Sequence, residues 1–283
     1  MQAYLINLER AQDRHDYILS ELSRLLPDIK VERALCIDIK VSGWKPPSFV
    51  KPGRWKSDRW SLTPSDIEIF RSHLDCWEKI AASGRPGLVL EDDLLFADDF
   101  GRVAGHLEQS GIHGIVRLDA VQSPLILGKP APSVDGYSLT PALSLTASAA
   151  AYLLDPQSAA SLARDARIER TVDDFLFDPT PKDRGARGHG LPILQLEPAI
   201  AIQAQFGSFS SADREIPEFL KMTKRTDVKT RKDRSYTGPL LYRLRKEVLR
   251  FAYRFRRAGR IKKIEKKGGR WGMPMLHPDL QWN

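Results

Sequence analysis

The spacing of apolar and polar positions along the chain predicts an α/β protein. Residues 3–8 form a short apolar run, which is typical of a buried strand. Apolar residues then recur at helical spacing up to Pro27, which ends the predicted helix. Residues 31–39 suit a second strand, so we expect the chain to open with a β-α-β unit. No glycine-rich G-x-G-x-x-G run follows the first strand, which argues against a dinucleotide-binding fold of that type.

The pattern beyond this unit predicts further helices and strands. Thr63 is a good helix cap, Pro64 suits the first helical position, and an apolar face at 3-4-3-4 spacing continues to Ala81. Residues 40–62 contain many Pro, Gly and Trp residues and are expected to form a surface loop. The remaining expectations are a strand over 88–90, a helix to about Gln109, a strand over 112–118, a loop or irregular hairpin over 122–141, a helix over 157–166 and a strand over 191–196. Residues 143–154 are small and apolar, which suits either close approach of a ligand or another backbone, or a tightly packed core strand.

Three consecutive carboxylates, Glu91, Asp92 and Asp93, follow the apolar run that ends at Leu90. Like charges at a strand end repel one another and are costly to desolvate unless a cation or a cluster of donors compensates them. Mn²⁺ or Mg²⁺ is the simplest compensator, because hard cations bind one or two carboxylates together with substrate phosphates. The alternative is a solvated acidic turn after a buried strand.

A second acidic pair, Asp173 and Asp174, precedes an apolar, helix-compatible segment. These residues are candidates for a general base or for an anchor of an acceptor hydroxyl that faces the first acidic group. Alternatively, their charges favour a helix N-terminus. His189 lies in a loop before a predicted strand, where it is a candidate to complete the metal shell.

Basic and imidazole side chains add three candidates. Arg10 and Arg14 follow the first strand, where they could contact a nucleotide or its phosphates, or simply be charges of the first helical turn. His73 lies in the middle of the second predicted helix, where a histidine is more often a structural donor than a catalyst.

The total composition excludes several protein classes. The 283 residues can bury a core without cross-links, and Cys36 and Cys76 lack the spacing of a disulfide framework or a zinc site. The N-terminus has no secretory pattern, and no run of about 18 apolar residues occurs. We therefore expect a cytoplasmic protein that does not span a membrane.

The net charge of +8 is unevenly distributed. Residues 221–270 contain 20 Lys and Arg and four Asp and Glu, a local net charge of +16. The rest of the chain contains 24 basic and 32 acidic residues, a net charge of −8. A mildly acidic body therefore carries a basic tail, and the two need separate explanations.

Residues 240–264 of this tail are expected to form a basic amphipathic helix. Such a helix can lie at an anionic membrane surface, where each cation contributes about 1 kcal/mol. Nucleic-acid binding through phosphate contacts is the rival, and a helix packed on the body is a third possibility. The apolar face would consist of Leu241, Leu244, Val248, Phe251 and Phe255.

Taken in order, these segments resemble glycosyltransferase family 25, which comprises bacterial lipooligosaccharide galactosyltransferases and their collagen-modifying relatives. The similarity extends over about residues 3–205 and departs from the usual family pattern at 65–70. The matching pieces are Ile6-Asn7-Leu8-Glu9-Arg10 with Asp13-Arg14, Leu62-Thr63-Pro64 leading to Ser72-His73-Leu74 and Trp77, Leu90-Glu91-Asp92-Asp93 with Phe96, Ala150-Ala151-Tyr152-Leu153-Leu154, and Val172-Asp173-Asp174-Phe175-Leu176.

The resemblance implies a GT-A-like nucleotide-diphospho-sugar transferase fold over residues 1–210. It does not cover residues 211–283, which we expect to form a basic, partly helical extension. It also implies an inverting, metal-dependent transfer of a galactose-like sugar from a UDP-sugar to a glycan or glycolipid acceptor in lipopolysaccharide, lipooligosaccharide or other surface-glycan synthesis. From the basic tail we expect a location on the inner face of the cytoplasmic membrane, with residues 240–264 at the anionic surface and nucleic acid not expected as a partner. Residues and resemblance together predict a site with a cation held by Glu91 and Asp93 and completed by His189, donor contacts from Asn7, Leu8, Arg10, Arg14 and Asp92, and a base at Asp173 or Asp174.

Two other classes of function remain open from the residues alone. The first is a non-enzymatic basic protein that binds nucleic acid or membrane and whose acidic loops are only structural. The second is another metal-dependent reaction of clustered carboxylates, such as phosphodiester hydrolysis, for which the chain lacks a matching His/Asp array.

Overall fold

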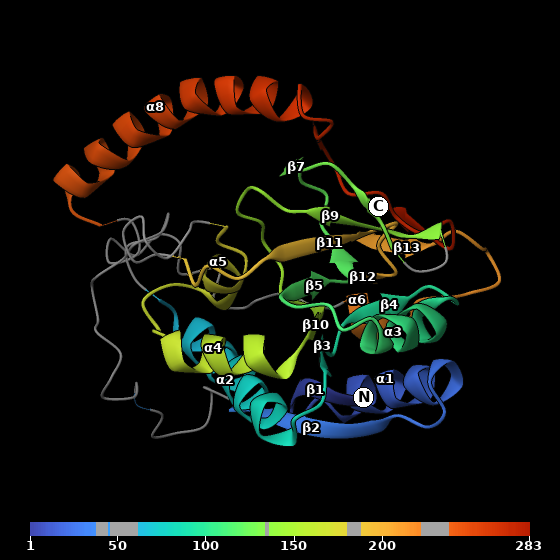
Figure 1. The fold of residues 1–283 in the computed structure, drawn as a ribbon. Helices are drawn as coiled ribbons and strands as arrows, with labels where there is room; N and C mark the ends of the chain where they lie inside the picture. The colour runs from blue at the N-terminus through green and yellow to red at the C-terminus, as the bar shows by residue number, and fades with distance from the viewer. Residues whose placement is uncertain (38–44, 46–61, 134–135, 180–187, 222–237) are drawn as a thin grey trace.

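A mixed sheet of eight strands forms the centre of the described part of the chain (Figure 1). The structure is a computed structural model that describes residues 1–37, 45, 62–133, 136–179, 188–221 and 238–283. β1 is parallel to β2 and β3, and β5 is parallel to β11, whereas β10 runs antiparallel between β3 and β5. The order across the sheet is β2 (Lys30–Cys36), β1 (Gln2–Leu8), β3 (Gly87–Glu91), β10 (Ala151–Leu154), β5 (Ile115–Arg117), β11 (Ile193–Glu197), β9 (Ser138–Pro141) and β8 (Ala131–Pro132).

Helices cover both faces of this sheet, as the α/β prediction requires. Successive residues of a strand point to opposite faces, so Ala3 and Leu5 of β1 enter one apolar cluster while Tyr4 and Ile6 enter the other. α1 and α3 lie on one face of the sheet, and α2, α4 and α5 lie on the other (Figure 1). Side chains of α1 and α3 complete the first cluster, and those of α2, α4 and α5 complete the second. The bounds are α1 Gln12–Leu25, α2 Pro64–Ser83, α3 Phe100–Gln109, α4 Pro156–Asp165 and α5 Val172–Leu176.

The predicted β-α-β opening and the predicted start of α2 are both confirmed. β1, α1 and β2 follow in order, and α2 begins with a capping box. In that box the backbone N–H of Asp66 donates to Thr63 Oγ1 over 3.1 Å, and the N–H of Thr63 donates to the Asp66 carboxylate over 3.0 Å. Apart from Lys45 and Leu62, the predicted surface loop of 40–62 lies outside the described residues.

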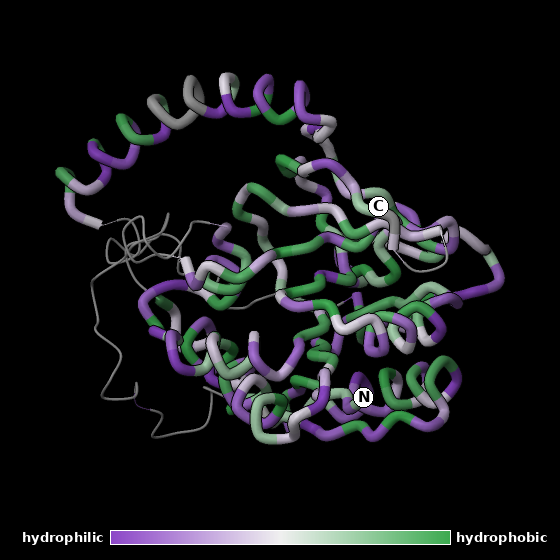
Figure 2. Tube along the Cα trace, viewed as in Figure 1, coloured by the Kyte–Doolittle hydropathy of each residue, from purple (hydrophilic) through white to green (hydrophobic). Residues whose placement is uncertain are grey.

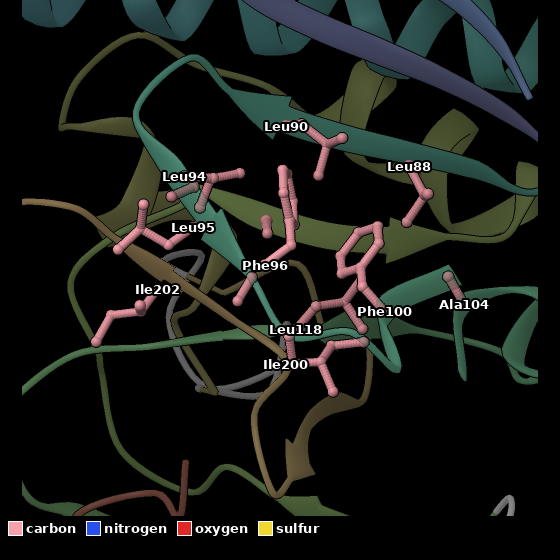
Figure 3. Close-up of a cluster of buried hydrophobic side chains, with 14 of the residues drawn as sticks. Leu88, Leu90, Leu94, Leu95, Phe96, Phe100, Ala104, Leu118, Ile200 and Ile202 are labelled. Carbon is pink, nitrogen blue, oxygen red and sulfur yellow. The ribbon is translucent and has the colours of Figure 1, made fainter. Parts of the chain in front are cut away.

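A short turn after β3 leads the chain into a second, smaller sheet. β4 (Leu94–Phe96) pairs with β12 (Ala201–Gln203), which also pairs with β6 (Asp119–Ala120). Leu90 of β3, Leu94 of β4 and Ile202 of β12 belong to one buried cluster (Figure 3). The residues between β3 and β4 are Asp92 and Asp93, so this apolar packing fixes both ends of the acidic turn.

Of the two alternatives for residues 143–154, the core strand holds only for the last four residues. Only Ala151–Leu154 pair in the sheet as β10, and the preceding residues are irregular, with Ser148 at a positive φ of 71°. Small apolar residues suit a closely packed loop as well as a strand, and hydropathy alone does not separate the two. The proline-rich stretch 122–141 does contain a hairpin, in which β8 and β9 pair antiparallel, together with β7 (Leu125–Leu127).

The C-terminal part of the chain contains a long helix and then returns to the body. α6 (Glu218–Lys221) precedes α8 (Leu240–Glu265) along the chain, and α8 projects along one side of the molecule (Figure 1). β14 (Arg270–Gly272) then pairs with β7, and β15 (Leu280–Trp282) pairs with β13 (Gly207–Phe209). The sequence analysis predicted the helix but not this return of residues 270–282. Within the described residues, no helix is both long and apolar enough to cross a bilayer.

Candidate active site

The acidic cluster lies at the C-terminal end of β3, in the middle of the main sheet. Glu91 is the last residue of this strand, and its backbone N–H donates to the Ala150 carbonyl over 2.8 Å. The Glu91 and Asp92 side chains are 21% and 16% exposed, whereas Asp93 is 3% exposed. Burial raises the pKa of Asp93 to about 7, and the charges of Glu91 and Asp92 act in the same direction.

One amide group bridges two of these carboxylates. Gln203 at the end of β12 donates from Nε2 to Glu91 Oε2 over 3.0 Å and to the two Asp93 oxygens over 3.0 and 3.2 Å. A partial positive charge therefore already lies where the two carboxylates converge. Sequence reasoning did not find Gln203, because only the pairing of β12 with β4 brings it here.

Asp92 points away from this pair toward β1 and α1. It accepts hydrogen bonds from Asn7 Nδ2 over 2.7 Å and from Arg14 Nη1 over 3.3 Å. Burial raises the pKa of Asp92, and Arg14 and Asn7 oppose that rise. Arg14 also donates twice to the Phe219 carbonyl of α6.

The five predicted donor-binding residues therefore divide into two groups. Asn7, Arg14 and Asp92 lie together, because the Asn7 amide and the Arg14 guanidinium both donate to the Asp92 carboxylate. Leu8 is half-buried at the end of β1, and Arg10 is exposed in the turn that follows.

A buried polar network lies next to the acidic cluster and contains Arg117, which is paired with Tyr152 and shares its face of the sheet. Arg117 and Asp119 are fully buried and form an ion pair, with Arg117 Nε 3.0 Å from Asp119 Oδ1. Ser148 donates to Asp119 Oδ2 over 2.8 Å and lies 3.2 Å from Gln203 Oε1. In the sequence, the i, i+2 spacing of Arg117 and Asp119 in an apolar stretch was the signal that could have indicated this ion pair, because such residues share one face of a strand.

His73 lies beside Glu91 on the face of the sheet that α2 covers. Its Nε2 is 3.7 Å from Glu91 Oε1, and its Nδ1 is 2.7 Å from the Tyr152 hydroxyl. The ring is fully buried, and burial lowers the pKa of His73 to about 3. The ring is therefore neutral, and its contact with Glu91 is not an ion pair.

The second acidic pair begins α5, and His73 connects it to the first. Asp173 and Asp174 occupy the first turn of α5, where both are partly exposed. Phe175 anchors this turn on α2, with its ring 5.8 Å from that of Trp77. The negative charge of Asp173 acts against the lowering of the His73 pKa by burial. Asp173 is therefore within electrostatic reach of the ring that contacts Glu91.

His189 is not available to a cation in this structure. Its Nε2 donates to the Leu176 carbonyl over 2.9 Å, and its Nδ1 accepts from the Leu191 N–H over 3.1 Å. Both ring nitrogens are thus used by the backbone, and neither retains a lone pair for a metal. In the described part of the chain, no group of three or more His, Cys, Asp or Glu residues forms a complete metal cage.

The acidic cluster nevertheless fits a divalent cation whose shell is completed from outside the protein. Glu91 and Asp93 converge on one point, Asp93 is almost fully buried, and the donor between the two carboxylates is an uncharged amide. Two carboxylates leave coordination positions for phosphate oxygens and water, which is the usual shell of Mg²⁺ at phosphate-containing substrates.

Comparison with known proteins agrees with the resemblance noted from the sequence. The sequence model of glycosyltransferase family 25 (LPS biosynthesis protein) matches residues 1–176, a range that contains both acidic groups. No curated protein matches the chain by sequence. The crystal structure of mannose-1-phosphate geranyltransferase from Thermus thermophilus matches over 69% of this chain and 72% of that chain, with 10% identity and a TM-score of 0.35, a level that carries no functional argument. The family match decides against the non-enzymatic alternative: the chain is an enzyme that belongs to glycosyltransferase family 25.

Proposed function

We propose that this glycosyltransferase moves a galactose-like sugar from a UDP-sugar to a saccharide acceptor in lipopolysaccharide or another surface glycan, with inversion at the transferred carbon. The observation that carries the proposal is the convergence of Glu91 and Asp93 on one amide donor at the end of β3. In α/β sheets this end of a strand is where ligands bind.

The two carboxylates are the proposed holders of Mn²⁺ or Mg²⁺. Such a cation, when bound, would act as a Lewis acid toward the departing diphosphate. Gln203 keeps the two carboxylates together without adding a charge. Ser148, which donates to Asp119 of the buried ion pair, lies 3.2 Å from Gln203 Oε1.

The remaining donor contacts are proposed around the end of β1. The exposed Arg10 follows Leu8 and suits the diphosphate or the nucleoside, since a guanidinium can bind phosphate through two parallel hydrogen bonds. Asn7 and Arg14 bond to Asp92 and fix the position of the acidic turn, so their proposed contribution to donor binding is to shape this wall of the site.

The base of an inverting transfer has to lie across the donor sugar from the leaving diphosphate. Asp173 is our first candidate and Asp174 the second, because both are partly exposed and Asp173 is within electrostatic reach of the His73 ring that contacts Glu91. The carboxylate would accept the proton of the acceptor hydroxyl as that oxygen attacks.

Two substitutions test the assignment with UDP-galactose, a saccharide acceptor and Mn²⁺. We expect Asp173→Asn to reduce UDP release and formation of glycosylated product by at least about a hundredfold, the range lost when a general base is removed. We expect Asp93→Asn, which removes one of the two proposed cation ligands, to cause a loss of at least comparable size. Asp98→Asn is the matched control, because this 62% exposed carboxylate also follows the acidic strand but pairs with Arg24 and Arg214 at the surface. Near-wild-type transfer by either test variant would refute its assigned role, and unchanged activity in EDTA would refute the cation.

We further propose that α8 holds the enzyme at an anionic membrane surface on the cytoplasmic side. This helix contains ten Lys and Arg and two acidic residues, and six of its described apolar residues are more than half exposed. Figure 2 shows hydrophobic and hydrophilic positions interleaved along it. Such a helix can bury its apolar face at the level of the lipid headgroups. The side chain of Phe255, also predicted for this face, lies outside the described part of the structure. The exposed apolar residues are Leu240 at 67%, Leu241 at 80%, Leu244 at 57%, Val248 at 69%, Leu249 at 56% and Phe251 at 64%.

Vesicle sedimentation tests this location. We expect binding to phosphatidylglycerol-containing vesicles, little binding to pure phosphatidylcholine, and at least about a tenfold loss in the double variant Leu244→Asp, Val248→Asp. Met275→Ser is the control, because this exposed apolar residue lies outside α8. Equal binding of the double variant, or tighter binding to DNA than to the anionic vesicles, would refute the membrane assignment.

A further inference from the structure

His73 is fully buried and has no contact with solvent. It lies in the middle of α2 and stacks on the Tyr152 ring at 5.7 Å with an interplanar angle of 16°. A histidine in such a place cannot bind substrate directly. Any role in the reaction therefore has to act through a neighbouring side chain.

The hydrogen bonds around Tyr152 determine which nitrogen of His73 carries the proton. Trp77 Nε1–H can only donate, so the Tyr152 oxygen, 2.8 Å away, accepts from it. The Tyr152 hydroxyl proton then goes to His73 Nδ1, which lies 2.7 Å away and accepts it. Because burial keeps the ring neutral, its own proton lies on Nε2.

This Nε2–H group lies next to the acidic cluster but donates no hydrogen bond to any described residue. In the described structure Nε2 is buried and makes no hydrogen bond, and it lies 3.7 Å from the carboxylate oxygen Glu91 Oε1. The other oxygen of that carboxylate accepts from Gln203 Nε2 over 3.0 Å. An unsatisfied buried donor costs free energy, so the arrangement lowers the stability of the fold.

We propose that His73 is a positioning residue that orients Glu91 for cation binding, with Nε2–H donating to Oε1 when the cation is bound. The inference rests on the proposed function, because it deepens the role of the same acidic cluster. Donors held against a metal-ligating carboxylate fix its orientation, and their loss typically weakens metal binding 10- to 100-fold. Trp77 and Tyr152 contribute indirectly, since their hydrogen bonds set the tautomer of His73.

The test measures Mn²⁺ affinity by isothermal titration calorimetry in the presence of saturating UDP, without acceptor and without turnover. We expect His73→Leu to weaken Mn²⁺ binding by about 10-fold or more, and His73→Gln, which restores an N–H donor, to recover most of that loss. Tyr152→Phe removes only the hydroxyl that sets the tautomer, and we expect an intermediate loss. Tyr4→Phe is the matched control, because Tyr4 is also a buried tyrosine of this core cluster and lies against Gly87 at the opposite end of β3.

Each outcome decides the inference. Absence of Mn²⁺ and Mg²⁺ binding in the wild-type enzyme would overturn the proposed cation and His73's role together. Wild-type binding with an unchanged affinity in a natively folded His73→Leu would overturn only the role of His73. Should His73→Leu fail to fold, ¹⁵N NMR of the wild-type ring decides: a protonated Nδ1, or unchanged affinity in Tyr152→Phe, would overturn the inference, and a protonated Nε2 with weakened affinity would support it.

Discussion

Replacing Asp93 with Asn should inactivate the enzyme and at the same time stabilise its cation-free form at alkaline pH. Asp93 is 3% exposed and lies beside two other carboxylates, which raises its pKa to about 7 from the ordinary 3.8. The folded protein therefore holds a proton on Asp93 that the unfolded chain releases near pH 4. Stability is consequently lost as pH rises from about 4 to about 7, and the loss is complete above that range.

The size of this effect follows from the shift. Raising the pKa of Asp93 from 3.8 to about 7 lowers the free energy of unfolding above pH 7 by at most about 4 kcal/mol. Asp93→Asn removes this loss, because Asn does not ionise. For a chain of 283 residues, this free energy corresponds to about 7 °C in Tm. We expect the variant to melt at higher temperature than wild type at pH 8 in EDTA, and the difference to vanish near pH 4.

Differential scanning calorimetry across this pH range, with and without Mn²⁺, is the measurement. Added Mn²⁺ should restore much of the deficit in the wild type and have little effect on the variant, because the variant lacks one of the two ligands. Asp98→Asn serves again as the control and should show no pH-dependent gain. A variant that melts below wild type at pH 8 in EDTA, or a difference that is constant from pH 4 to 8, would contradict the reasoning.

Three further predictions concern the framework of the site. Asp119→Asn leaves the buried Arg117 without its charge partner, so we expect a loss of about 3–5 kcal/mol in urea unfolding followed by circular dichroism. Gly101→Ala would place a methyl group 1.7 Å from the backbone oxygen of Leu25, and since backbone cannot yield like a side chain, thermal melts should show a loss of about 3 kcal/mol or more. Thr63→Ala removes the cap of α2 and should cost about 1 kcal/mol in the same urea assay, whereas Thr63→Ser should cost little.

Much of the local structure could be predicted from sequence because its causes are local. The spacing of apolar residues predicted β1 and α1, and Thr63, Pro64 and Asp66 predicted where α2 begins. Within residues 143–154 only Ala151–Leu154 form a strand. The residues before Ala151 hydrogen-bond to distant groups instead, as Ser148 does to Asp119.

The candidate site divides in the same way. The acidic run at 91–93 was visible because three charges after an apolar strand have no packing explanation. Gln203, Ser148 and the neutral His73 acquired their positions only through strand pairing and helix packing, and none of them has a local pattern that reveals its role.

The sequence by itself determined the opening β-α-β unit, the start of α2, the acidic strand end and the basic amphipathic helix, since each depends on residues close together along the chain. Only the tertiary structure decided which side chains surround the carboxylates: it bonded Asn7 and Arg14 to Asp92, committed His189 to the backbone, and brought His73 against Glu91. The physical reason is that a buried polar group takes its protonation, its charge and its partners from neighbours that are distant in sequence, and the register of the strands selects those neighbours.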